Sequence, residues 1–471
     1  MSLKLKLGLI GSAIPVFVFL LWGWAVGLYA AIPAQFNKAA WDRDFEAELD
    51  ALLKEGLTQE QIDDASAKMR ECLVIGEELE RITDEVEKEY VESRRSAGEW
   101  IVLVGVDLSV LGRPAATPED EAVLEVSEQA LRRYREAGLV ERAERALDMA
   151  RVPTWEYFRV DPSNPDQTAG LDYLGRLRRL SLMLQAEAKV WAAVGDWVSV
   201  CRSFRVRHRL SNSMFDEPAL MIDKLVGLSL ATQWYKFVRE ILVDRGADGE
   251  GLAALAACYD QLQFSVIRPQ LFDAQRLNDL YVQAVILPTG TSQRAIFLPQ
   301  AVRASEVVRA RMNERWHLSA QERFAQPLDT DEILRQELPL LHPGRFMMGG
   351  VSEQVLQIVD QFECEWRGVR LMLAIEVFRA RRGELPGVLE ELVPDCIAAL
   401  PIDPYAPDGK FRYRRVEPAG DVEGSDYLLY SVGLDGKDDQ GTEPVGTESY
   451  RHFEATRGKC TGCDFVINRY D

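Results

Sequence analysis

Residues 171–210, LDYLGRLRRLSLMLQAEAKVWAAVGDWVSVCRSFRVRHRL, contain two stretches of helical periodicity separated by a short turn. Apolar residues recur every three or four positions in both stretches, which is the spacing of an amphipathic helix. Gly195-Asp196 interrupts the pattern. We therefore predict one helix over Leu171–Val194 and a second over Trp197–Leu210.

Similar helices are predicted on both sides of this pair. Thr117 followed by Pro118 supplies an N-cap and a proline at the first helical position. Further periodic runs predict helices at residues 58–95, 139–151, 219–237, 251–285, 300–316 and 352–382. Helices of roughly 12–20 residues in succession indicate an α-solenoid or an irregular helical array. The Ala193–Asp196 turn resembles the inter-helix turn of tetratricopeptide-like arrays. Because no period of about 34 residues is present, a non-repeating bundle is the alternative.

An uncharged apolar segment, Leu7–Ile32, lies near the N-terminus. As a helix it is about 39 Å long, which exceeds the roughly 30 Å of a membrane's hydrocarbon core. We predict a single-pass anchor in the inner membrane, with Lys4 and Lys6 keeping the N-terminus in the cytoplasm and the body periplasmic. A cleaved signal peptide is the alternative, although its apolar region is normally only about 7–15 residues long.

Two segments are candidates for self-association. Gly23 and Gly27 form the small-xxx-small pattern that lets membrane helices approach closely, although glycine is also simply common in such helices. Thr58 and Gln61 form a capping box that opens an acidic helix. Apolar residues within its positions 62–90 follow alternating 3-4 spacing, so this face is predicted to pack either against a second chain or against the protein's own body.

The composition changes near Pro394, after which glycine, proline and aspartate are frequent. Phe411, Tyr413 and Arg415 predict one strand and Tyr427–Val432 a second, joined by a hairpin loop. The chain is therefore mostly α-helical with a small β-rich end. We divide it into an anchor (1–33), an acidic long-helix segment (34–98), a helical array (99–345), a long helix with its junction (346–398) and a β-rich module (399–471).

The last hundred residues contain an ordered series of motifs: Arg382-Gly-Glu-Leu-Pro386, Leu400-Pro-Ile-Asp-Pro-Tyr405, Gly409-Lys-Phe-Arg-Tyr413 and Tyr427-Leu-Leu-Tyr-Ser-Val-Gly-Leu-Asp-Gly436. This part resembles the C-terminal region of bacterial type II secretion pseudopilins. The pseudopilin leader and the glutamate of its apolar helix have no counterpart here. The whole chain is similar to uncharacterised membrane-anchored bacterial proteins with a helical middle and this tail.

The segment after the second predicted strand contains Asp435, Asp438 and Asp439. Carboxylates this close together repel one another unless solvent or a cation offsets their charge, and calcium accepts irregular sets of oxygen ligands. The resemblance implies a calcium loop here, with Asp464 as a further ligand. The alternative is a solvated acidic turn with Lys437 as a partial counter-ion.

Cys460 and Cys463 form a C-x-x-C pair near the end of the chain. A thioredoxin-like role requires a helix after a strand, and zinc requires two more ligands than the nearby sequence offers. In an oxidising compartment, a short local disulfide is the preferred interpretation. The other five cysteines lie mainly in apolar helical contexts and are predicted to be buried thiols.

The net charge of −20 argues against nucleic acid as a partner, because nucleic acids bind basic surfaces. No metalloprotease, P-loop or dinucleotide-binding motif occurs. The leading hypothesis is thus a membrane-tethered interaction or scaffold protein without catalytic activity, with calcium as the candidate cofactor. The alternatives are a component of a secretion or pseudopilus-type machine and a hydrolase with an unrecognised site.

Overall fold

The structure is a computed structural model of the 471-residue chain. It describes residues 44–96, 106–108, 111, 117–156, 172–215, 220–243, 248–262, 273, 276–281, 292–315, 318–326, 328–338, 351–416, 426–445 and 462–468. The predicted anchor, with Gly23 and Gly27, lies outside these residues. Within them, no helix has both the length and the apolar character needed to cross a membrane.

Most described residues are helical, as predicted. The α-helices are α3 Phe45–Leu53, α4 Gln59–Ser96, α5 Pro118–Glu136, α6 Leu139–Ala146, α7 Asp172–Ala193, α8 Trp197–Phe215, α9 Met221–Val243, α10 Gly249–Gln261, α12 Ser292–Arg315, α13 Ala320–Ala325, α14 Thr330–Glu337 and α16 Val351–Arg382. Two short 3-10 helices, η2 Thr154–Glu156 and η3 Leu389–Leu392, join them. The strands are β1 Arg412–Arg415, β2 Tyr427–Ser431 and β3 Phe465–Val466.

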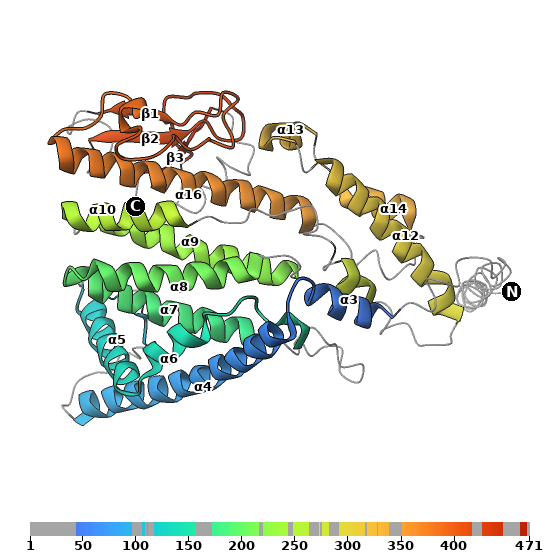
Figure 1. The fold of residues 1–471 in the computed structure, drawn as a ribbon, viewed down its shortest axis with the longest axis horizontal. Coiled ribbons are helices and arrows are strands. Elements are labelled where there is room, and N and C mark those ends of the chain that lie inside the picture. The colour runs from blue at the N-terminus through green and yellow to red at the C-terminus, as the bar shows by residue number, and fades with distance from the viewer. Residues whose placement is uncertain are drawn as a thin grey trace, which may run out of the picture.

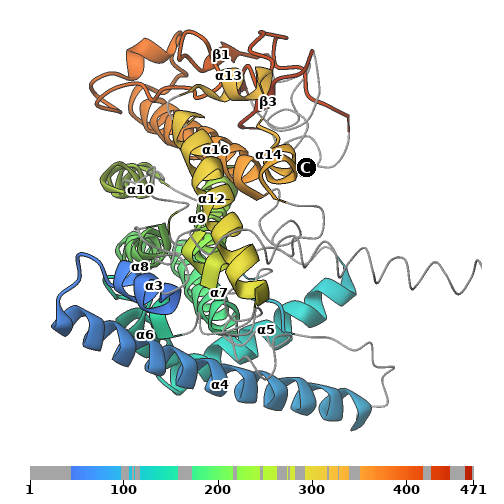
Figure 2. The same ribbon diagram turned by 90° about the vertical axis from the view of Figure 1, so that its right-hand side faces the viewer.

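The helices are stacked in layers, as Figure 1 shows, from α4 through α7, α8 and α9 to α16, with the sheet on the far side of α16. One hydrophobic core lies among α3 to α7, and a second joins α8, α9, α10 and α16 to the sheet. Figure 2 shows α12 and α14 beside this stack. The β-rich module therefore shares its core with the helical body.

Local capping signals explain where several helices begin. The backbone N–H of Thr58 donates to Gln61 Oε1 at 2.9 Å, and the N–H of Gln61 donates to Thr58 Oγ1 at 3.3 Å. Thr117 caps α5 in the same way, together with Asp120. Gly195 adopts a left-handed conformation (φ 76°) in the turn between α7 and α8, which glycine does at little cost. These helix starts were predicted correctly.

Other boundaries were wrong. The helical prediction over 251–285 is interrupted after Gln261, where Leu262 leaves the helical conformation, and residues 276–281 are helical again. The helix predicted over 139–151 ends at Ala146. In contrast, α8 continues to Phe215, because the residues beyond Leu210 also pack into the core. Helices α3, α13 and α14 were not predicted.

The apolar face of α4 packs against the protein's own helices α5, α6 and α7. Its seam residues Met69, Cys72 and Val86 are fully buried. Arginines from the neighbouring helices pair with its acidic side chains: Arg142 of α6 lies 2.7 Å from both Glu71 and Glu78, and Arg176 of α7 lies 3.0 Å from Glu77. The seam within residues 62–90 is therefore covered inside one chain.

The sheet is antiparallel, in the order β1-β2-β3. Tyr413 pairs with Leu429, and Tyr430 pairs with Val466. Strands β1 and β2 lie where the sequence predicted them, whereas β3 was not predicted. The sheet approaches α16 closely at Gly368, where an added Cβ would lie 2.6 Å from Ile467 Cγ2. Glycine at this position lets the sheet cover the helix.

Candidate functional site

The loop after β2 contains the predicted cation ligands and is shaped by left-handed residues. Gln440 (φ 62°) and Gly441 (φ 78°) turn the chain back toward β3. An added Cβ at Gly441 would lie 2.3 Å from Leu428 Cδ2, so this position requires glycine. The turn directs the N–H of Gly441 to Asp464 Oδ2 at 2.6 Å. It thereby joins the loop to the segment that carries Asp464.

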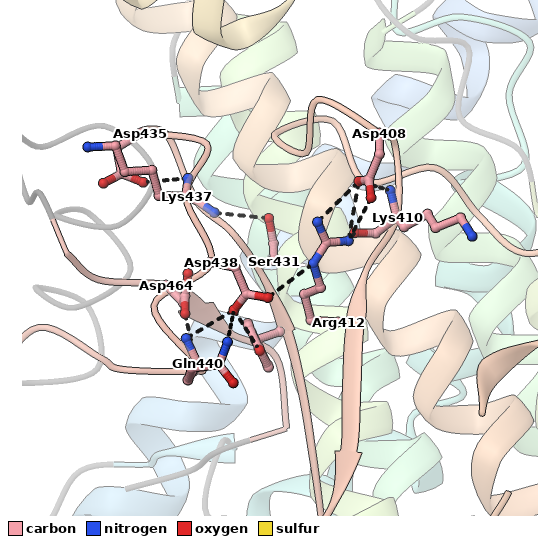
Figure 3. A network of polar contacts seen from close by, with 12 residues as sticks. Asp408, Lys410, Arg412, Ser431, Asp435, Lys437, Asp438, Gln440 and Asp464 are labelled. Atoms are coloured by element: carbon pink, nitrogen blue, oxygen red, sulfur yellow. Dashed lines mark hydrogen bonds and ion pairs between the residues drawn. The ribbon is translucent and has the colours of Figure 1, made fainter. Parts of the chain in front are cut away.

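Two of the four predicted ligands, Asp435 and Asp438, have a hydrogen-bond or ion-pair partner on each carboxylate oxygen, and Figure 3 shows the bond of Asp435 to Lys437 and the contacts of Asp438. Asp435 accepts from the N–H of Lys437 at 3.0 Å and from the N–H of Gly462 at 3.2 Å. Asp438 Oδ1 accepts from Tyr430 Oη at 2.9 Å and from the N–H of Gln440 at 3.0 Å. Its other oxygen lies 3.4 Å from Arg412 Nε. These two aspartates hold the loop in shape.

The other two predicted ligands each keep one oxygen without a partner. Asp439 Oδ2 and Asp464 Oδ1 are buried and accept no hydrogen bond from any described residue. Asp464 is 0% exposed. A Cβ placed at Gly462 would lie 3.9 Å from Asp439 Oδ1, so Asp439 faces the segment that leads to Asp464. Buried polar atoms without partners are uncommon in proteins, so these two oxygens are candidates for contact with a cation or with water.

The electrostatics of Asp464 agree with this geometry. Burial raises the pKa of its carboxyl group to about 6, and the nearby charges of Asp439 and Asp438 act in the same direction. The N–H groups of Gly441 and Asp439 partly offset the increase. A cation between these carboxylates would reverse the effect of burial and lower this pKa.

The oxygens present suit a hard cation such as calcium, which takes carboxylate, carbonyl and water oxygens. However, no three His, Cys, Asp or Glu side chains among the described residues are arranged to hold a metal ion. Of the four predicted ligands, only Asp439 and Asp464 keep an oxygen that a cation could contact without displacing a described partner, while Asp438 and Asp435 support the loop around them. Backbone carbonyls and water would have to complete the coordination.

A further buried carboxylate, outside the four predicted ligands, was not predicted from the sequence. Asp403 lies on the segment before β1 and is 1% exposed. Its Oδ1 accepts from the N–H of Tyr405 at 2.9 Å and from Ser431 Oγ at 2.8 Å, whereas its Oδ2 has no partner. Burial raises its pKa to about 6. Its bonds fasten residues 403–405 to β2, which explains an aspartate within the Leu400–Tyr405 motif.

The cysteines fall into two groups. Cys463 is disulfide-bonded, and its predicted partner Cys460 lies outside the described residues. The other five cysteines are free thiols: Cys72, Cys201, Cys258, Cys364 and Cys396. The pairing of Cys460 with Cys463 stays a prediction.

Two features of the described residues bear on the hydrolase alternative. A cleft of about 580 Å³ lies between α3, α4 and η2, and its lining includes Asp50, Lys54 and Trp155. None of the described residues that line it is a histidine or cysteine. His208 lies elsewhere, on α8, where its ring is 6.2 Å from that of Trp366 and its Nε2 is 3.0 Å from Asn212 Nδ2.

Comparison with known proteins does not assign the chain to a family. No protein-family model matches the chain, and neither a curated protein nor a solved structure is significantly similar to it.

Proposed function

We propose that the chain is a membrane-tethered interaction protein whose C-terminal module is stabilised by calcium. The observation that carries this proposal is the pair of buried carboxylate oxygens without partners, Asp439 Oδ2 and Asp464 Oδ1. The charge of Asp439 disfavours the ionised form of the buried Asp464, and a divalent cation would offset that repulsion. The cation's role is structural, because the site joins the β2 loop to the β3 segment.

Calcium binding is tested by thermal unfolding of the full-length protein in detergent. Binding only to the folded state stabilises a protein by mass action. We expect millimolar calcium to raise the melting temperature of the wild type by several degrees, and not that of Asp439→Asn or Asp464→Asn. Asp395→Asn is the matched control, because its exposed side chain lies outside the loop, 3.8 Å from Arg382. An equal melting temperature of the wild type in calcium and in chelator would remove the site.

The membrane part of the proposal is supported by the uncharged run Leu7–Ile32, which is long enough to span a bilayer. A reporter fused after Asp471 should be active only outside the cytoplasm. Substituting three leucines of the run by arginine should release the protein from the membrane fraction. A wild-type chain that stays in the soluble fraction would contradict the anchor.

A role in interaction is supported by aliphatic side chains exposed between α16 and β1. Val388 and Ile402 are 52% and 64% exposed. Exposed apolar groups of this kind are compatible with a protein-binding surface, although single ones are common. Ile402→Asp should weaken a partner's binding without lowering the melting temperature.

The second candidate is a component of a secretion or pseudopilus-type machine. Its support is the packing of an antiparallel sheet against the long helix α16, in the region whose motifs resemble pseudopilins. The test is cross-linking in intact cells followed by purification. Inner-membrane secretion proteins should be recovered with the wild type and lost with Ile402→Asp. Recovery of no secretion protein would favour the first candidate.

A further inference from the structure

Helices α8 and α10 approach each other closely because a glycine faces a tryptophan. An added Cβ at Gly251 of α10 would lie 2.3 Å from Cε2 of Trp197 in α8. Further along, the rings of Phe204 and Tyr259 lie 5.9 Å apart. From the first contact to the second, the residue number increases on both helices, from 197 to 204 on α8 and from 251 to 259 on α10. Helices α8 and α10 therefore run in the same direction. Between these two contacts, each helix contributes one cysteine.

Cys201 and Cys258 lie in the same layer of this interface. Cys201 Sγ is 3.6 Å from the carbonyl oxygen of Ala254, one turn before Cys258. Cys258 Sγ is 3.8 Å from the carbonyl oxygen of Cys201. Their exposed fractions are 5% and 2%. Each thiol therefore lies against the backbone turn that carries the other, and the two thiol groups are in contact, which favours a disulfide between the two helices.

We infer that Cys201 and Cys258 are a disulfide-forming pair that cross-links α8 to α10 when the protein meets a low-molecular-weight disulfide. The inference concerns a covalent modification site within the helical body and does not rest on the proposed function. Cys201 and Cys258 lie on α8 and α10, outside both the predicted membrane anchor and the carboxylate loop.

The two thiols differ in a way that suits the exchange reaction. The contact with the Cys258 thiol lowers the pKa of Cys201, and the positive charge of Arg205 acts in the same direction. The pKa of Cys258 is raised by the same contact and by burial. Cys201 therefore forms the thiolate more readily, and thiolates are the attacking species in disulfide exchange.

The reaction balances with oxidised glutathione as the disulfide. The Cys201 thiolate attacks one sulfur of glutathione disulfide, the S–S bond breaks, and one glutathione thiolate leaves. Cys258 loses its proton to solvent and attacks Cys201 Sγ, and the second glutathione leaves. The protein loses two thiol hydrogens and gains one S–S bond, while the glutathione disulfide is reduced to two thiols.

Other described thiols lack this arrangement. Cys72 on α4 is buried, and burial raises its pKa to about 12. Cys364 on α16 is also fully buried, and its pKa is raised by burial and by the charge of Asp403. None of the described contacts of these two residues involves another cysteine. Cys72 therefore supplies a matched control.

The experiment uses full-length protein in detergent, reduced and then transferred into a glutathione redox buffer. Because the thiols are buried, one sample reacts in the native state and a second is unfolded in urea and refolded in the same buffer. Non-reducing digestion and mass spectrometry should find the Cys201 and Cys258 peptides joined, two hydrogens lighter than their sum. Closing a loop of this length should raise the melting temperature by several degrees, and dithiothreitol should reverse the gain.

Three Cys→Ser variants test the inference, and the oxidation state of Cys463 shows whether the buffer was oxidising. Cys201→Ser and Cys258→Ser should lose both the joined peptides and the increase in melting temperature, whereas Cys72→Ser should keep both. Oxidised Cys463 in the same digest shows that the buffer was oxidising. If Cys463 is oxidised and both other thiols can still be alkylated after refolding, the inference is overturned. A glutathione adduct that persists on wild-type Cys201 would overturn it as well.

Discussion

Glu187 in the helical body and Asp464 in the β-rich module are both buried carboxylates, at 1% and 0% exposure. Glu187 on α7 is held by the guanidinium of Arg135, which donates from Nε and, at 2.8 Å, from Nη2. Among the described residues, no arginine or lysine pairs with Asp464, and one of its oxygens has no partner. Within this part of the chain, the carboxylate of Glu187 is thus paired with a cation and that of Asp464 is not.

The comparison extends to the regions around them. The acidic helix α4 faces arginines of α5, α6 and α7, so its many carboxylates mark a solvated, internally paired surface. The β2 loop and the β3 segment have fewer carboxylates, but one oxygen each of Asp439 and Asp464 is buried without a partner among the described residues. The number of carboxylates in a segment therefore does not by itself predict a cation site, and burial without a counter-ion is the more specific indication.

The largest effect is expected from removing the counter-ion in the helical body. Arg135→Met leaves Glu187 buried and unpaired, which typically lowers the free energy of unfolding by about 3 kcal/mol. Chemical denaturation of the variant measures this loss. Arg132→Met, an exposed arginine on the same helix, is the control and should change little.

Adding Glu187→Leu to Arg135→Met should recover most of that loss, because it removes the buried charge as well. If Arg135→Met alone leaves the free energy of unfolding unchanged, burial of the Glu187 carboxylate does not depend on its pairing with Arg135. The difference proposed between Glu187 and Asp464 would then be wrong.

A smaller effect of opposite sign is expected at Asp464. Without calcium, Asp464→Asn removes a buried charge that no cation offsets, while its side-chain oxygen can still accept from the N–H of Gly441. We expect the free energy of unfolding to rise by about 1–2 kcal/mol at pH 7.5. In millimolar calcium the order should reverse, because only the wild type binds. A variant less stable than the wild type in chelator would show that the carboxylate is compensated without a cation.

The pH dependence tests the same group more finely. The pKa of Asp464 is about 6 in the folded protein and is lower when unfolded, so protonation favours the folded state. As pH rises from about 4 to 6, the wild type should lose stability relative to Asp464→Asn, by at most about 1.4 kcal/mol per pH unit. Above pH 6 the difference in free energy of unfolding between the wild type and Asp464→Asn should be constant. Urea denaturation of both proteins in chelator between pH 4 and 8 measures it, and a difference independent of pH would refute the raised pKa.

Features encoded locally were predictable from the sequence. The starts of α4 and α5 follow from Thr58 and Thr117, because a capping side chain acts within three residues of its own position. Strand β3 was not predictable, since its two residues form a strand only by pairing with Tyr430 and Ser431, some 35 positions earlier. The end of α10 at Gln261 likewise lacked a clear local stop signal.

The candidate site likewise has a part that local sequence predicts and a part that depends on the folded chain. The spacing of Asp435, Asp438 and Asp439 indicated an acidic loop, and the family resemblance added Asp464. Which of their oxygens have partners depends on Tyr430, Arg412 and Gly462, which only the folded chain brings near. Asp403 was missed because nothing in its own segment shows that it meets Ser431.

The smallest effect is expected on the exposed face of α4. Arg81 and Glu85 lie 2.7 Å apart, one helical turn from each other, and their side chains are 60% and 47% exposed. Exposed pairs of this kind contribute about 0.3–0.5 kcal/mol, because water screens both charges and ordering two long side chains opposes the attraction. Arg81→Ala should therefore change the free energy of unfolding by less than about 0.5 kcal/mol, and 0.5 M salt should remove the change. Arg81 and Arg135 each pair with a glutamate, but Glu85 is exposed and Glu187 is buried. The two variants therefore differ mainly in the exposure of the carboxylate that loses its partner. A loss at Arg81 as large as that at Arg135 would mean that pairing alone, rather than burial, determines how much a carboxylate needs its cation.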